Sequence, residues 1–136
     1  MEKRYPLLNG LSSEELDLIT IQLSENALDL STFELDFEEL IRYVKKALDA
    51  QVLVVGDFWD QENKDEMKKQ ACEETGAEFI RLNEIKGVDQ YQCGMNTAVY
   101  DSDGGPHTVE HLGVVKHPGD TGMKWIADRL IEVVKE

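Results

Sequence analysis

A histidine in a loop ahead of a predicted helix is the residue best suited to catalysis in this sequence. His117 opens the run His117-Pro118-Gly119-Asp120-Thr121-Gly122-Met123, in which a proline and glycines shape the chain. Histidine gains and loses a proton near neutral pH, and a loop on a rigid base can hold it toward a cleft, as a general base requires. We therefore take His117 as a candidate base. The plainer interpretation is a surface histidine without a role.

An asparagine at the end of a predicted strand is the second candidate. The apolar, β-branched run from Leu16 to Leu23 predicts a buried strand, and Ser24-Glu25-Asn26-Ala27 follows it. Asn26 lies beyond the carboxyl end of this predicted strand, where parallel sheets bind ligands. An asparagine that only serves a turn is the alternative.

The remaining elements alternate between strands and helices. Apolar residues at helical spacing predict a helix from about Glu34 to Leu48, and the run from Val52 to Val55 predicts a second strand. Further along, the patterns predict a polar helix 62–75 closed by Gly76, a strand 78–82, a hairpin with strands near 97–100 and 107–110, and a last helix from Asp120 or Thr121. This order favours an α/β fold with a mostly parallel sheet. In such sheets ligands bind beyond the carboxyl ends of the strands, here 23–27, 56–60 and 83–119.

Length and charge narrow the classes of function. The 136 residues suit a single domain, 1–136. The 28 acidic and 14 basic residues give a net charge of −14, which argues against nucleic acid and against anionic membrane surfaces as partners. No apolar run approaches the length of a membrane span or a secretion signal, so we expect a cytoplasmic protein with Cys72 and Cys93 as free thiols.

Two blocks of the sequence resemble a known enzyme family. The segment 113–128, with His-Pro, a short turn, a glycine and an amphipathic helix, resembles the last characteristic block of the SGNH hydrolases, also called GDSL-type esterases. Residues 16–26 are similar to that family's third strand, which ends in Gly-x-Asn-Asp. Over roughly residues 8–136 the resemblance implies a flavodoxin-like three-layer α/β/α sandwich that hydrolyses esters. It implies His117 as the base and Asn26 as the oxyanion donor.

The sequence departs from the family at the nucleophile. It contains no Gly-Asp-Ser motif, and the nearest counterpart, Gly56-Asp57-Phe58, follows a later strand and lacks a hydroxyl. Val114 occupies the usual position of the triad acid. Glu110 or a backbone carbonyl would therefore have to orient His117.

Other side chains near the strand ends complete the expected site. Ser24 stands where the family has a glycine. We expect Ser24, Asp57 and Trp59 to contact the substrate, a carboxyl ester or an O-acylated carbohydrate, although Trp59 could equally be a rim aromatic packed on the core. Ser24 and Cys93 are the minor alternatives for a nucleophile, with Cys93 as a thiol paired with His117.

We expect neither a cofactor nor a metal. The spacing of His107, His111 and His117 matches no familiar zinc pattern. Asp101-Ser102-Asp103-Gly104 begins like a calcium loop, but the later ligands of that motif are absent, so a turn is the better interpretation.

The blocks that this sequence lacks would leave the predicted strand 18–23 as a bare sheet edge. Such an edge attracts another strand. We therefore expect homodimerisation through it or completion by a complementing N-terminal segment, unless residues 1–15 cover it locally. The leading hypothesis is a portion of an SGNH-type esterase, missing its first strands and inactive alone. The alternative is a non-catalytic binding or interaction domain on the same scaffold.

Overall fold

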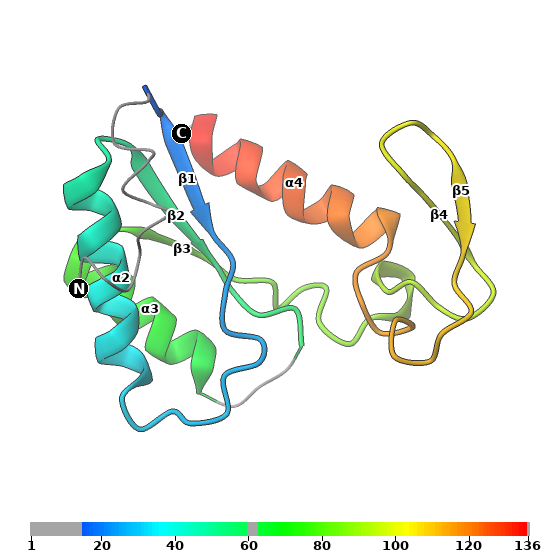
Figure 1. Cartoon of the computed structure of the whole chain (residues 1–136), viewed down its shortest axis with the longest axis horizontal. Coiled ribbons are helices and arrows are strands. Elements are labelled where there is room, and N and C mark those ends of the chain that lie inside the picture. The colour runs from blue at the N-terminus through cyan, green and yellow to red at the C-terminus, as the bar shows by residue number, and fades with distance from the viewer. Residues whose placement is uncertain (1–14, 60–62, 136) are drawn as a thin grey trace. The chain divides into compact units, whose positions relative to one another are not determined.

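The computed structural model describes residues 15–59 and 63–135 (Figure 1). Contacts within the chain divide these residues into two compact units. Unit 1 contains residues 15–57 and 63–81, and unit 2 contains Phe58, Trp59 and residues 82–135. The chain passes from unit 1 to unit 2 and back around residue 58, directly after the second strand.

Unit 1 is built on a three-stranded parallel sheet in the order β1-β2-β3, with β1 at Leu18–Ile21, β2 at Gln51–Val55 and β3 at Glu78–Ile80. Ile19 lies opposite Val52, and Val54 lies opposite Phe79. This register places apolar side chains from all three strands on one face, because paired residues of parallel strands point to the same side. Leu53 and Val55 of the central strand β2 alternate with them and are also buried, as a strand buried on both faces requires. Ile80 of β3, the partner of Val55, is buried as well.

Two helices, α2 (Phe33–Ala47) and α3 (Lys64–Thr75), contribute to one core with the first of these faces. The apolar stripe of α2 supplies Phe37, Ile41 and Val44, which are at most 5% exposed. From α3, Ala71 and Cys72 join the same core. The α3 helix ends at Thr75 and is followed by Gly76, whose φ of 71° is the left-handed conformation expected at a C-cap, so the prediction for Gly76 is confirmed.

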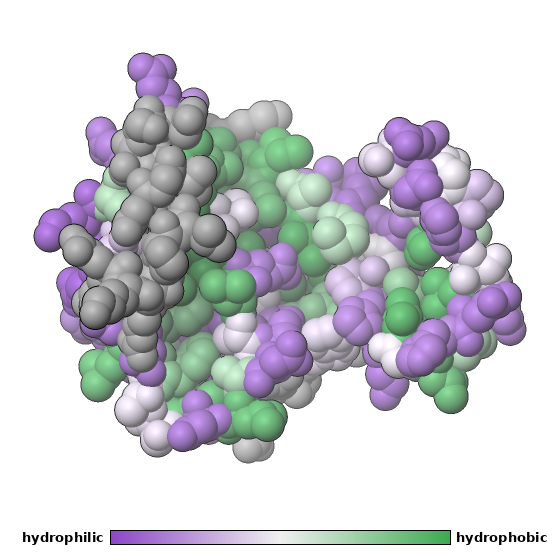
Figure 2. All heavy atoms as spheres, in the orientation of Figure 1, coloured by the Kyte–Doolittle hydropathy of each residue, from purple (hydrophilic) through white to green (hydrophobic). Residues whose placement is uncertain are grey.

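Unit 2 contains the 3₁₀ turn η1 (Asp89–Tyr91), the hairpin strands β4 (Ala98–Tyr100) and β5 (Pro106–Thr108), and helix α4 (Asp120–Lys135). The hairpin is antiparallel, with Val99 opposite His107. Hydrophilic side chains cover much of it in Figure 2. Its turn is closed by the carboxylate of Asp101, which accepts hydrogen bonds from the backbone N–H groups of Asp103 (3.0 Å) and Gly105 (2.7 Å).

The predicted α/β class and the parallel sheet are confirmed, while the three-layer flavodoxin-like sandwich stays a prediction. Element boundaries differ by a few residues. The first strand covers 18–21 rather than 16–23, and the third ends at Ile80 rather than Leu82. Among the described residues, no helix is long and apolar enough to cross a bilayer.

Candidate functional site

The loop that carries His117 is fastened to the segment 91–94 by backbone hydrogen bonds. The N–H of Cys93 donates to the carbonyl of His117 (2.8 Å), and the N–H of Gly94 donates to that of Val115 (3.0 Å). The N–H of Gly119 donates to the carbonyl of Tyr91 (3.0 Å). The backbone on both sides of His117 is therefore fixed, while its side chain is exposed.

Two buried glycines explain why this loop and the start of α4 need small residues. A Cβ atom at Gly119 would lie 2.9 Å from the carbonyl oxygen of Gln92, and one at Gly122 would overlap the carbonyl oxygen of Tyr91. Both glycines therefore serve the close approach of two backbones. The glycines of the run His-Pro-Gly-Asp-Thr-Gly therefore have a packing role, and the histidine lies three residues before the start of α4.

The ring of Trp59 lies against the imidazole of His117. Their centroids are 4.7 Å apart at an interplanar angle of 86°, an edge-to-face contact. Trp59 also donates from Nε1 to the carbonyl of Lys116, at 3.1 Å. The structure thus brings together two of the residues predicted for the site, both in unit 2, and Trp59 limits the positions open to the His117 ring.

The expected acid partner of His117 is not paired with it. Glu110 is exposed, and neither its carboxylate nor the His117 ring forms a hydrogen bond or ion pair with another described residue. The predicted pairing of Glu110 with His117 is therefore not formed in this structure. No serine hydroxyl in residues 15–59 and 63–135 is bonded to His117 either.

Cys93 is buried beside the same loop, but its environment does not suit a nucleophile. Its Sγ lies 3.4 Å from the carbonyl oxygen of Pro118 and can donate to it. Burial raises the pKa of the Cys93 thiol, and the carboxylate of Asp120 raises it further. A reactive cysteine needs the opposite shift, because the thiolate is the attacking species. The contacts of Cys93 are those of a structural residue that packs beside the His117 loop.

Asn26 belongs to unit 1, where it is exposed in the turn that follows β1. The N–H of Ala27 donates to the carbonyl of Ser24 at 2.8 Å and closes this turn. Ser24 has a φ of 105°, in a region that residues other than glycine rarely adopt. Since Asn26 and His117 belong to different units, their convergence on one cleft stays a prediction.

Asp57 is predicted at the mouth of the site, but it is 1% exposed, so its carboxylate is buried. The Oγ of Ser24 donates to its Oδ1 at 2.9 Å, Lys68 forms a buried ion pair with the same oxygen, and Lys64 lies 3.8 Å from Oδ2. Asp57 therefore cannot touch a substrate without rearrangement, and the hydroxyl of Ser24 is engaged with it. Contact of Asp57 with a substrate stays a prediction.

The histidines of the 83–119 region do not gather around a metal position. His107 is bonded through Nε2 to the carboxylate of Asp101 at 2.9 Å, within the hairpin. Among the described residues, no group of three or more potential ligands lies close enough to hold a metal ion.

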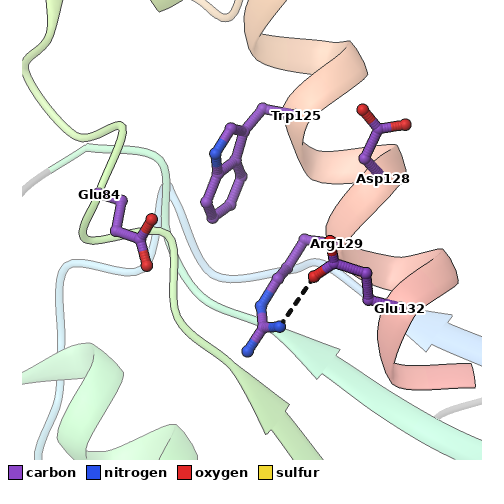
Figure 3. Close-up of a pocket in the computed structure, with 5 residues that line it drawn as sticks. All are labelled: Glu84, Trp125, Asp128, Arg129 and Glu132. Carbon is purple, nitrogen blue, oxygen red and sulfur yellow. Dashed lines mark hydrogen bonds and ion pairs between the residues drawn. The ribbon is translucent and has the colours of Figure 1, made fainter. Parts of the chain in front are cut away.

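A cavity of about 370 Å³ in unit 2 was not foreseen from the sequence. In Figure 3 the indole of Trp125 and the guanidinium of Arg129 extend from α4 toward Glu84. Asp128 and Glu132 complete the lining. Arg129 is paired with Glu132 at 3.1 Å and Asp128 with Lys124 at 2.5 Å, so several of the charged groups around the cavity already have partners.

Comparisons of this chain with protein-family models, with curated proteins and with solved structures gave no match.

Proposed function

We propose that this chain carries the general base and an oxyanion donor of an SGNH-type ester hydrolase that acts on carboxyl esters or O-acylated carbohydrates. The observation that carries the proposal is the imidazole of His117, which is exposed on a fixed loop and rests against Trp59. A general base needs a defined position and a ring nitrogen that can take a proton, and neither ring nitrogen is bonded to another described residue.

The backbone at Ser24 gives independent support. In the family that the sequence resembles, a glycine stands at this position, and glycine adopts a positive φ without strain. The φ of 105° at Ser24 is thus a conformation that suits the family's residue. This supports the alignment of Ser24-Glu25-Asn26-Ala27 with the Gly-x-Asn-Asp motif, and with it Asn26 as the oxyanion donor.

In the proposed reaction, a serine hydroxyl attacks the ester carbonyl while His117 takes its proton. His117 then returns the proton to the departing alcohol, and water releases the acyl group by the reverse sequence. The side-chain amide of Asn26 donates to the oxygen that becomes negative, an interaction worth about 3 kcal/mol in such sites. We propose that the serine comes from a polypeptide segment outside this sequence.

The edge of β1 offers a docking place for such a segment. Among the described residues, β1 pairs with β2 and with no other strand. An open groove of about 380 Å³ runs beside it, lined by residues 19–23 together with Leu40 and Val44 of α2. An extended apolar segment added to β1 would form a further strand pair at its outer edge and cover these side chains. Residues 1–14 lie outside the described residues.

The test is hydrolysis of p-nitrophenyl acetate by this chain alone and by the chain co-expressed with the polypeptide encoded directly upstream of Met1. We expect negligible turnover by the chain alone and clear turnover by the complex. His117→Ala should then reduce turnover about 10²- to 10⁴-fold, the usual contribution of a general base. His111→Ala is the matched control, since His111 is also an exposed loop histidine of unit 2.

Two results would overturn the proposal. Turnover by the isolated chain that His117→Ala abolishes would mean that the nucleophile lies within this sequence. A complex that forms but hydrolyses nothing would instead favour a non-catalytic binding domain on this scaffold.

A further inference from the structure

Four buried charged side chains form a cluster that contacts the turn carrying Asn26. Asp57, Lys64, Asp65 and Lys68 are between 0% and 7% exposed. Charged side chains are rarely buried to this extent, because removing each from water costs several kcal/mol unless partners compensate. Two carboxylates and two ammonium groups balance one another here, so the cluster as a whole is neutral.

The contacts of Lys64 join this cluster to the turn. From the first turn of α3, its Nζ donates to the backbone carbonyls of Ser24 (2.7 Å) and Glu25 (3.2 Å), the two residues that precede Asn26. The same nitrogen lies 3.8 Å from Oδ2 of Asp57, an oxygen that has no hydrogen-bond partner among the described residues. Lys64 is therefore a single cation shared by the turn and the cluster.

Asp57 makes a second connection to the same turn. Its Oδ1 accepts the hydroxyl of Ser24 at 2.9 Å and is paired with Lys68, whose Nζ also donates to the carbonyl of Val55 at 3.3 Å. The backbone N–H of Asp57 in turn donates to Oδ1 of Asp65 at 2.9 Å. The end of β2, the start of α3 and the turn after β1 are thus joined through one set of charges.

We infer that Lys64 and Asp57 are positioning residues that hold the turn 24–27, and with it the side chain of Asn26, in one place. The turn needs such support because Ser24 occupies a strained backbone region, which persists only where surrounding contacts enforce it. Buried charge-assisted hydrogen bonds suit this task, since they are directional and stronger than neutral ones. The catalytic consequence of this inference rests on the proposed function, but its structural part does not.

The structural part is tested by backbone ¹⁵N relaxation in Lys64→Met, which keeps most of the side-chain length and removes the ammonium group. We expect the order parameters of Glu25, Asn26 and Ala27 to fall from about 0.85 to below about 0.6, with Val54 in β2 unchanged. Lys69→Met is the matched control, because Lys69 lies on the same helix with its side chain 47% exposed. If Lys64→Met does not fold, Lys64→Gln is measured in the same way.

The catalytic part uses the co-expressed complex described above with p-nitrophenyl acetate. We expect Lys64→Met to lower kcat at least about 10-fold with KM changed less than about 2-fold, because a misplaced amide weakens the transition state more than substrate binding. Unchanged order parameters in the turn, or an equal loss at Val54, would overturn the positioning role. If the turn loosens and the complex has no activity to lose, the positioning role stands and the proposed function fails.

Discussion

The indole of Trp59 and the imidazole of His117 meet edge to face, with their centroids 4.7 Å apart. Trp59 follows the second strand of unit 1 in sequence, yet it contacts His117 and Lys116 of the loop before α4. The indole N–H donates to the carbonyl of Lys116, so the tryptophan is bonded to the residue directly before the histidine that its ring contacts. A side chain far away in sequence thus defines the environment of the candidate base.

Trp59→Ala should release the His117 ring. An aromatic ring at this distance shifts the ¹H resonances of its neighbour, so we expect the His117 ring signals to move toward those of an exposed histidine such as His111. Trp59→Phe keeps an aromatic ring but loses the hydrogen bond to Lys116, and should cost about 1 kcal/mol of unfolding free energy. His117 signals that do not respond to Trp59→Ala would contradict the contact.

Gly122→Ala should destabilise the start of α4, although alanine is the better helix former. The added methyl group would overlap the carbonyl oxygen of Tyr91, and backbone shifts of this kind cost about 1–3 kcal/mol. Urea unfolding followed by circular dichroism measures the change. Thr121→Ala, at the exposed neighbouring position, is the control and should change stability by less than about 0.5 kcal/mol.

Substitutions at Ser24 separate its backbone strain from its hydroxyl. Ser24→Ala loses the hydrogen bond to Asp57 and keeps the strain of a φ of 105°, whereas Ser24→Gly loses the bond and relieves the strain. We expect the glycine variant to be more stable than the alanine variant by about 1 kcal/mol or more in urea unfolding. Equal stabilities would mean that the backbone here is not strained.

The elements of this fold were predictable because each depends on a short-range pattern. The apolar spacing of Phe37, Ile41 and Val44 identifies α2, and all three residues are buried as that pattern requires. Strand ends were less predictable. Leu82 is apolar and buried, so the sequence pattern extends the third strand to it, but pairing with β2 stops at Ile80.

The candidate site was predictable only in part. The proline and glycines next to His117 predict a shaped loop, whereas nothing in the local sequence predicts that Asp57 is buried. Charged residues are exposed by default, and Asp57 is buried only because Lys64 and Lys68 reach it from α3. One feature of the sequence could have indicated these ion pairs. Lys64 and Lys68 are four residues apart, so they lie on one face of the helix that follows β2.

The buried thiol of Cys72 should make stability fall at high pH. Burial raises its pKa from 9.0 to about 11. The folded state therefore holds the proton more tightly than the unfolded state, so this stabilisation is complete below pH 9 and is lost as pH rises toward about 11. Between pH 9 and pH 11, urea unfolding should show that the unmodified protein loses more unfolding free energy than Cys72→Ala does. We expect the difference between the two losses to be on the order of 2 kcal/mol. The variant is needed as the reference because lysines and tyrosines titrate in the same range.

A double-mutant cycle tests whether Asp57 and Lys68 form one unit. Each single variant, Asp57→Asn or Lys68→Met, leaves the other charge buried with an incomplete set of partners, and we expect each to cost about 3–5 kcal/mol of unfolding free energy. The double variant removes both charges together, so it should be more stable than the sum of the single losses predicts, by at least about 1 kcal/mol. Losses that add to within about 0.5 kcal/mol would show that the two charges act independently. In that case Lys64 would have to balance Asp57 alone, from 3.8 Å away, while also bonding the turn that carries Asn26.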